Sequence, residues 1–203
     1  LKPCQSLFKL SKMKQPDLEN FVGIHNRKYC DGGQCIRLYR TFMKKKDPEA
    51  ANIVMGHNEE DLLGLGTIFS LLAYKKLYDG EYHPKQCVIL EQELKIVIEL
   101  SAAAPVNVSC GNSDFYLSVN GYEARMLVHL KEGKLRQYYR NYKDYEFIPG
   151  EDTAMPKSIT RYMDKSLKIA TTPQTCYTWF NCDEDFLNNE KKQMQYLTHT
   201  LPF

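Results

Sequence analysis

The sequence lacks several features that would point to a membrane or nucleic-acid protein. Every apolar run is much shorter than the length of about eighteen residues that a membrane-spanning helix requires. The formal net charge of +2 falls well short of the strongly basic balance that a grip on a phosphate backbone usually needs. These absences predict no membrane span in this chain and no nucleic-acid partner.

Catalytic signatures are also missing. The chain has no G-x-S-x-G elbow, no P-loop, no H-E-x-x-H motif and no dinucleotide-binding glycine pattern. Its five histidines stand apart, and its cysteine spacings do not match a zinc ribbon. His57 and the acidic residues 59–61 are interpreted as the polar start of a helix. We therefore predict no catalytic residues, no metal site and no cofactor, and the sequence favours a protein that is not an enzyme.

What is present is an ordinary globular composition. Apolar residues make up 43% of the 203 residues and charged residues 26%. This length predicts a single domain over 1–203. Within it we expect an N-terminal arm over 1–29, an α+β core over 30–182, and a C-terminal helix and tail over 183–203.

Seven cysteines and one N-glycosylation sequon at Asn107 indicate the secretory pathway, where disulfides persist and asparagines are glycosylated. A start at Leu1 without a leader fits a trimmed product. Because seven is odd, one cysteine, Cys4, is expected to be free or to link a partner. Reduced thiols in a cytosolic protein are the alternative. The candidate disulfide pairs are Cys30 with Cys35, Cys87 with Cys110, and Cys176 with Cys182.

A buried helix is predicted over residues 59–78. Asn58 and the three acidic residues after it supply an N-cap and an acidic first turn. Apolar residues then recur at helical spacing until Asp79-Gly80 ends the segment. The positions expected in the core are Leu62, Leu63, Leu65, Phe69, Leu72, Ala73 and Leu77.

Further along the chain, apolar residues recur at every second position. Apolar and charged residues alternate over 88–100, which is typical of a half-buried strand. Asn120-Gly121 and Glu132-Gly133 then indicate two tight hairpin turns, because both central residues of a type I′ turn need positive φ. Together these patterns predict an antiparallel meander over 88–142.

Other segments complete the predicted fold. The alternation in residues 36–43 predicts a strand, and the charge, Pro48 and Gly56 in 44–57 predict a break after it. Asp183 is expected to cap a short C-terminal helix. The predicted class is therefore α+β: an antiparallel sheet packed against a buried helix, with a C-terminal helix and disulfide staples.

A protein-binding role follows from these features. The chain has 14 tyrosines, and tyrosine is enriched at interfaces. With the disulfide spacing and the sequon, this predicts a secreted or cell-surface glycoprotein that binds another protein. Receptor-complex subunits, adhesion factors and immune modulators all fit.

The predicted hairpin register places arginines and tyrosines on the outer face of the meander. Such a cationic, aromatic face suits a partner with an acidic surface. The alternative, which the sequence slightly favours, is that Glu91, Glu93 and Glu99 of the 88–100 strand pair with these arginines across the sheet. The candidate partner-binding residues are Tyr116, Arg125, His129, Arg136, Tyr138, Arg140 and Tyr142.

Two other functions stay open at this point. The first alternative is a carrier of a small apolar ligand inside a curved sheet, although the same residues would also make an ordinary core. Its lining would be Leu94, Ile96, Ile98, Phe115, Leu117 and Met126. The second alternative is a hydrolase with an unfamiliar constellation of side chains.

Overall fold

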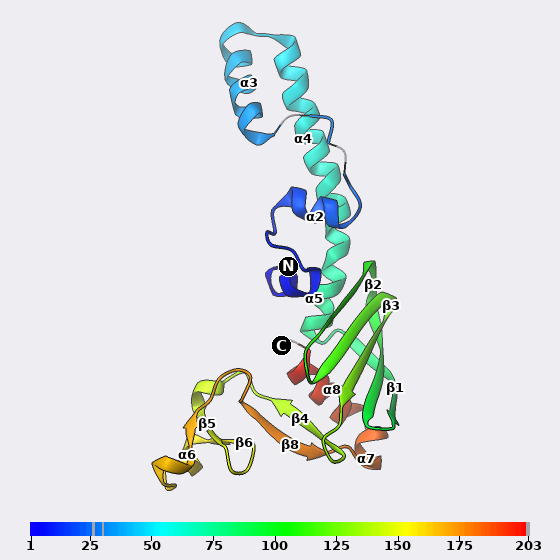
Figure 1. The fold of residues 1–203 in the computed structure, drawn as a ribbon. Helices are drawn as coiled ribbons and strands as arrows, with labels where there is room; N and C mark the ends of the chain where they lie inside the picture. Colours follow the sequence, from blue (N-terminus) through cyan, green and yellow to red (C-terminus); the bar gives the residue numbers. More distant parts are fainter. Residues whose placement is uncertain (26, 30, 202–203) are drawn as a thin grey trace.

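The computed structural model describes residues 1–25, 27–29 and 31–201. It contains antiparallel sheets and a long helix, which confirms the predicted α+β class. The helices of residues 32–79, called the arm from here on, extend away from a three-stranded sheet. Two smaller sheets lie at the opposite end of the molecule (Figure 1). The main core lies where the base of the arm, the large sheet and the C-terminal helices meet.

The N-terminal segment forms short helices beside the arm. η1 (Lys2–Cys4) and α1 (Gln5–Phe8) place Leu7 and Phe8 in the main core. The ring of Phe8 packs edge-on against Tyr74 at a centroid distance of 5.1 Å. α2 (Gln15–Phe21) follows and lies against the long helix of the arm. Because single-turn helices are unstable alone, tertiary contacts hold this segment.

Two helices form the outer end of the arm: α3 (Gly32–Lys45) and α4 (Pro48–Ile68). The Asp31 side chain caps α3 by accepting a hydrogen bond from the Gln34 backbone at 2.9 Å. The strand predicted at 36–43 is therefore wrong. The apolar side chains of residues 36–43 fit both a strand spacing and a helical spacing, and the cap at Asp31 favours the helix.

Asp47 begins α4 in the same way. Its side chain accepts a hydrogen bond from the backbone of Glu49 at 3.0 Å. Pro48 occupies the first helical position, where a backbone N–H would have no partner within the helix, so proline loses no hydrogen bond there. The break predicted over 44–57 is thus confined to the two residues before Pro48, and the helix predicted from 59 begins eleven residues earlier.

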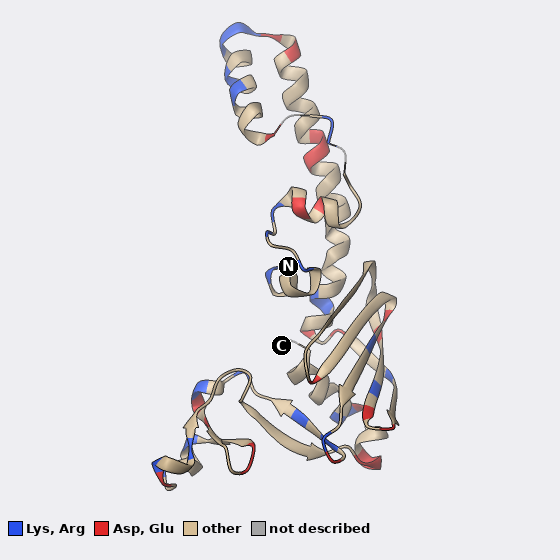
Figure 2. Cartoon of the chain, in the orientation of Figure 1, with Lys and Arg blue, Asp and Glu red and all other residues tan. Residues whose placement is uncertain are grey.

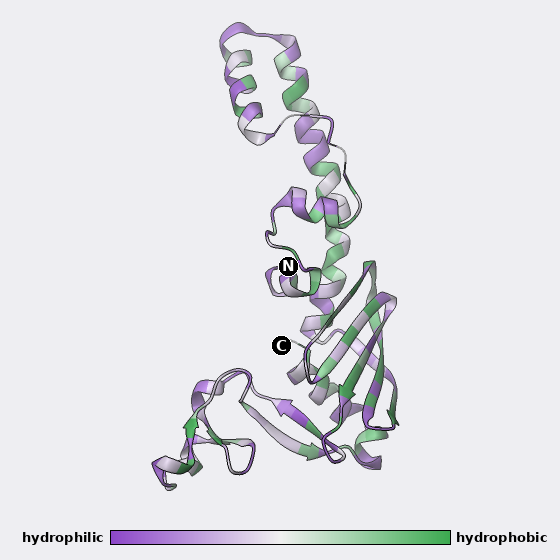
Figure 3. Cartoon of the chain, viewed as in Figure 1, coloured by the Kyte–Doolittle hydropathy of each residue, from purple (hydrophilic) through white to green (hydrophobic). Residues whose placement is uncertain are grey.

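A short 3₁₀ segment, η2 (Phe69–Leu71), separates α4 from α5 (Leu72–Asp79). Leu71 and Leu77 are fully buried against the sheet. Higher on the arm the apolar side chains face solvent, with Leu62 72% exposed, and Figure 3 shows apolar residues along this helix. Burial was therefore wrongly predicted for Leu62, Leu63, Leu65, Phe69 and Leu72.

The large sheet has the order β1 (Tyr82–Leu90), β2 (Glu93–Gly111) and β3 (Phe115–His129), all antiparallel. Its inner face packs against α5 and the C-terminal helices. Phe115 is the only one of the six residues considered as a ligand lining that borders a main cavity of the described chain. All six are buried in this core, which gives the carrier function no support. They are Leu94, Ile96, Ile98, Phe115, Leu117 and Met126.

The hairpin predicted at Asn120-Gly121 does not form. β3 runs straight through these two residues and keeps pairing with β2. Gly121 does take a positive φ of 55°, but as part of an irregular register opposite Ala104. The Asn-Gly dipeptide thus indicates a backbone irregularity inside a strand rather than a chain reversal.

The second predicted turn, Glu132-Gly133, is confirmed. Both residues have positive φ, and Lys131 and Lys134 pair around them. However, β4 (Lys134–Tyr138) then leaves the large sheet and pairs with β8 (Tyr177–Asn181). The predicted meander over 88–142 therefore stops at the end of β3.

The third sheet has the order β6 (Thr153–Pro156), β5 (Tyr145–Ile148) and β7 (Ile169–Ala170). Three short helical segments accompany it: η3 (Tyr142–Asp144), α6 (Lys157–Thr160) and η4 (Lys165–Leu167). The turn between β5 and β6 rests on β8, because the Trp179 indole N–H donates to the carbonyl of Asp152 at 2.7 Å.

Two helices end the described chain: α7 (Glu184–Leu187) and α8 (Glu190–Thr200). As predicted, Asp183 caps the first of them by accepting from the Phe186 backbone at 3.0 Å. Tyr196 and Leu197 of α8 are buried in the main core.

The predicted disulfide staples are wrong for two of the three pairs. Cys176 and Cys182 flank the extended strand β8, which separates them by about 20 Å, and a disulfide allows at most about 7 Å between Cα atoms. Cys87 pairs with Ile96, at the opposite end of β2 from Cys110. All four thiols are free, and burial raises the pKa of Cys87 to about 12.

The remaining cysteine predictions concern Cys4, Cys30 and Cys35. Cys30 lies outside the described residues, so the Cys30–Cys35 pair stays a prediction. Cys4 is fully buried beneath α5, which leaves it unable to reach a partner protein in this conformation. Within residues 1–25, 27–29 and 31–201, no helix combines the length and apolarity needed to cross a bilayer.

Candidate functional site

A polar cluster joins α2 to α4 in the middle of the arm. Arg27, in the segment after α2, donates through Nε and Nη2 to both carboxylate oxygens of Glu19, each at 2.7 Å. Its Nη1 donates to Asp61 Oδ1 on α4 at 2.6 Å. Figure 2 shows acidic residues gathered on both helices at this level. One guanidinium thus binds carboxylates from two helices. This group, with Gln15 and His57 beside it, is called the arm cluster below.

Glu19 is the buried member of this cluster, with 2% exposure. The Arg27 hydrogen bonds and a third bond from Gln15 hold its pKa below the usual value, against the opposing effect of burial. The same carboxylate raises the pKa of Arg27. Gly64 allows this close approach, because a Cβ there would lie 2.0 Å from Glu19 Oε1.

His57 and Asp61 lie one turn apart on α4. His57 Nε2 lies 3.4 Å from Asp61 Oδ2, the oxygen that Arg27 does not contact. The Nδ1 atom of His57 is buried and has no hydrogen-bond partner among the described residues. Asp61 is 35% exposed, so this imidazole–carboxylate pair borders solvent. The pair was missed as a site because residues 57–61 were interpreted as a helix start.

The arm cluster does not form a metal site by itself. Among the residues that the structure describes, no group of three or more His, Cys, Asp or Glu side chains is placed to hold a metal ion. Both oxygens of Glu19 and one oxygen of Asp61 are already bound by Arg27. The donors needed for a complete coordination shell are therefore not assembled here.

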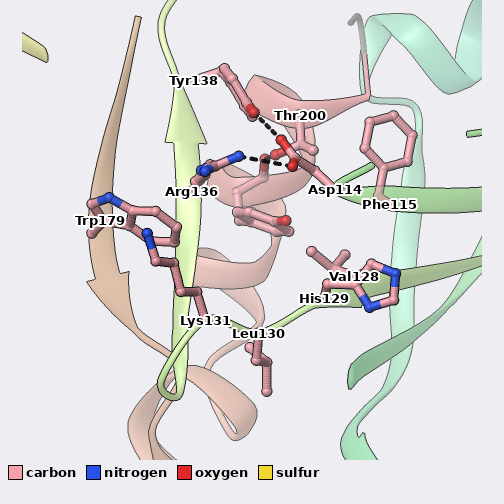
Figure 4. Close-up of a pocket in the computed structure, with 11 residues that line it drawn as sticks. Asp114, Phe115, Val128, His129, Leu130, Lys131, Arg136, Tyr138, Trp179 and Thr200 are labelled. Carbon is pink, nitrogen blue, oxygen red and sulfur yellow. Dashed lines mark hydrogen bonds and ion pairs between the residues drawn. The ribbon is translucent and has the colours of Figure 1, made fainter. Parts of the chain in front are cut away.

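A second polar cluster borders a pocket at the other end of the molecule (Figure 4). Asp114, in the β2–β3 turn, accepts a hydrogen bond from Arg136 Nη1 at 2.8 Å and another from the Tyr138 hydroxyl. The pocket has a volume of about 110 Å³. Its apolar walls include Phe115, Val128 and Leu130.

Arg136 lies against two aromatic rings of β8. Its guanidinium carbon is 4.6 Å from the Tyr177 centroid and 4.8 Å from the Trp179 centroid. Desolvation opposes the charge of Arg136, but Asp114 and the nearby tyrosines raise its pKa overall. Burial raises the pKa of Tyr177 to about 12, so this hydroxyl stays protonated. Arg136 is thus a fixed cation on an aromatic surface.

The structure brings together three of the seven predicted partner-binding residues: His129, Arg136 and Tyr138 line this pocket. Tyr138 is nearly buried, so it does not point outward as predicted. The others are scattered. Tyr116 is exposed on β3, Arg125 pairs with Glu123 on the same strand, Arg140 lies beside α8, and Tyr142 belongs to η3.

Several residues of these two clusters could not be found from local patterns. Glu19 and Arg27 belong to segments without a sustained period, and their contact with α4 is tertiary. Trp179 and Asp114 meet Arg136 only because β4 pairs with β8 rather than β3. The one available signal was the four-residue spacing of His57 and Asp61, which places two side chains on one helix face.

The comparisons with known proteins gave one match. A family model described as the RNase H superfamily matches residues 1–73, which contain α2, α3, α4 and the arm cluster. Neither the curated proteins nor the solved structures contained a match.

This match corrects the predicted function. A hydrolase family of nucleic-acid enzymes does not fit a secreted glycoprotein that acts by binding another protein, and it contradicts the prediction that nucleic acid is not a partner. The free thiols in β1, in β2 and on either side of β8 remove part of the reasoning for secretion. Asn107 is exposed on β2, but the predicted glycosylation loses its basis. The extracellular location itself stays a prediction.

Proposed function

We propose that this chain is part of a hydrolase that cleaves phosphodiester bonds in nucleic acid. The observation that carries the proposal is the match of residues 1–73 to the RNase H superfamily model. The arm cluster lies inside the matched segment and contains the ionisable side chains that such a reaction needs. This makes the second alternative from the sequence the best supported one.

Within the cluster, His57 and Asp61 are the proposed functional pair. Hydrolysis requires proton transfer to or from water and the leaving oxygen, and imidazole is well suited to this near neutral pH. Asp61 Oδ2 faces His57 and is not bound by Arg27, and Nδ1 of His57 has no hydrogen-bond partner among the described residues. Arg27 and Glu19 hold α2 against α4 and so position the pair.

Nucleases often use divalent cations held by carboxylates. The described residues do not fit this role by themselves, since Arg27 neutralises Glu19 and occupies one oxygen of Asp61. No step of the proposed reaction is therefore routed through a metal ion in this chain.

The proposal is tested with labelled single-stranded RNA, single-stranded DNA, an RNA–DNA hybrid and duplex DNA. Each is incubated with the 203-residue chain in Mg²⁺ or Mn²⁺, and products are resolved on denaturing gels. We expect cleavage of at least one substrate. Asp61→Asn and His57→Gln should each lower the rate by about a hundredfold or more, because each removes a proton-transfer group.

Glu59→Gln is the matched control. Glu59 lies on the same turn of α4 but is exposed, so its loss should leave the rate within about twofold. Circular dichroism of every variant checks that α4 is intact. Absence of cleavage for all four substrates, or equal rates for the Asp61 and Glu59 variants, would overturn the proposal.

A further inference from the structure

The pocket beside Arg136 has the chemistry of a small binding site that no comparison assigns. It lies outside the segment that matches the RNase H superfamily model. A second cavity of about 320 Å³ adjoins it, because the two share Asp114, Phe115, Arg136 and Tyr138. Together they have the volume of a typical small-ligand site.

Arg136 has an unused donor in this pocket. Nη1 is bound by Asp114, but Nε is buried and has no hydrogen-bond partner among the described residues. A buried donor without an acceptor is costly. A ligand that offers a carbonyl or ring-nitrogen acceptor to Nε would remove this cost.

Asp114 offers the complementary group. Its two oxygens provide about four acceptor positions, and Arg136, Tyr138 and Ser113 use three of them. A ligand N–H can therefore bind the carboxylate beside Arg136. Such a ligand presents a donor next to an acceptor on one flat edge, which is the pattern on the edges of nucleobases.

The surroundings favour a base over a free phosphate. The Asp114 carboxylate would repel an anion placed next to Arg136, and Phe115, Val128 and Leu130 make apolar walls. Basic side chains are instead found at the rim, where Lys131 and His129 are largely exposed. A strand could thus insert a base while its phosphates stay near the rim.

We infer that this pocket binds one unstacked base of a single-stranded nucleic acid through Asp114 and Arg136. The inference rests on the proposed function, which makes nucleic acid the substrate class. It assigns the segment after the arm a role in holding the strand, while the arm cluster carries out hydrolysis.

Trp179 allows a direct test, because it lines the pocket and is the only tryptophan in the chain. The 203-residue chain is titrated in EDTA with single-stranded RNA of about eight nucleotides, and Trp179 fluorescence is followed. An oligomer of the same length with abasic residues serves as the probe for backbone binding. We expect a saturable fluorescence change with the base-bearing strand and binding at least about tenfold weaker with the abasic strand.

Variants locate the contact. Arg136→Lys keeps the charge but removes the forked donors, and should weaken binding about tenfold or more. If this change disturbs folding, Leu130→Phe adds bulk at the pocket wall while keeping Asp114 and Arg136, and should have the same effect. Lys134→Gln is the matched control: it removes an exposed charge from the same strand and should change binding by about twofold or less.

Equal affinity for abasic and base-bearing strands would overturn the inference in favour of backbone binding. No fluorescence change with any strand, or full binding by a folded Leu130→Phe variant, would also overturn it. These outcomes are separate from the cleavage assay. Cleavage without base-dependent binding defeats only this inference, and base-dependent binding without cleavage defeats only the proposed function.

Discussion

Gly64 shows how one missing side chain positions the arm cluster. Its α-carbon faces the carboxylate of Glu19, which Arg27 and Gln15 hold in place. Gly66, two residues further along α4, faces open space. The two glycines therefore carry different constraints although both lie in the same helix.

Alanine substitution should separate them. Gly66→Ala should stabilise the protein by about 0.4–1 kcal/mol, because alanine restricts the unfolded chain and favours the helix. Gly64→Ala should instead destabilise it by about 1–3 kcal/mol, since the new methyl group displaces Glu19 from Arg27. Urea unfolding measures both values. Equal stabilisation by the two changes would contradict the described packing of α2 on α4.

The lowered pKa of Glu19 predicts how the arm responds to acid. A carboxylate whose folded pKa lies below its unfolded value of about 4.3 stabilises the fold fully above that pH. The contribution is lost as the pH falls through the folded pKa. Glu19→Gln should therefore cost about 1–3 kcal/mol at pH 7, and the difference from the wild type should shrink below about pH 4.

This pH dependence is measured as the unfolding free energy of both proteins between pH 7 and pH 3. Asp164→Asn is a suitable control, because Asp164 also has a lowered pKa but caps η4, far along the chain from the arm. A difference between wild type and Glu19→Gln that stays constant with pH would show that the carboxylate is not what binds Arg27.

At the scale of the element, α4 and α5 bury their apolar side chains unevenly. Leu77 of α5 is 1% exposed, whereas Leu62 and Leu63 of α4 face solvent. The sequences of α4 and α5 do not indicate this difference. The spacing of apolar residues shows which of them share a helix face, but not which other element covers that face.

Substitutions on the two helices should therefore differ in effect. Leu77→Ala should destabilise the protein by about 2–5 kcal/mol through the cavity it leaves. Leu62→Gln and Leu63→Gln should each change stability by about 0.5 kcal/mol or less, since they are already in water. Thermal unfolding of the three variants decides the point. A large loss for Leu62→Gln would show that a partner or a second copy covers this face in solution.

Local chemistry predicted some elements and not others. Asp183 before its helix and Glu132-Gly133 in its turn act on their immediate neighbours, and both predictions are confirmed. Asn120-Gly121 failed because a neighbouring strand provided partners that kept the chain straight. The strand predicted at 36–43 failed because Asp31 and the residues after it favour a helix start, a signal that the alternation obscured.

At the scale of the whole molecule, the sequence predicted the α+β class but not the arrangement of its parts. The pairing of β4 with β8 joins residues about forty positions apart, and no pattern near either strand specifies that partner. The same pairing places Trp179 beside Arg136 and so builds the pocket. The predicted Cys176–Cys182 disulfide failed for a related reason, since closeness in sequence is not closeness in an extended strand.

The 3₁₀ turn at Phe69–Leu71 has a mechanical consequence for this arrangement. It is the joint between α5, which is anchored on the sheet, and α4, which extends about 30 Å beyond it. Short 3₁₀ segments within helices often act as hinges. A rotation of about 10° at this joint would swing the Pro48 end of α4 through about 5 Å. Such a rotation would change the distance between the His57–Asp61 pair and the Arg136 pocket.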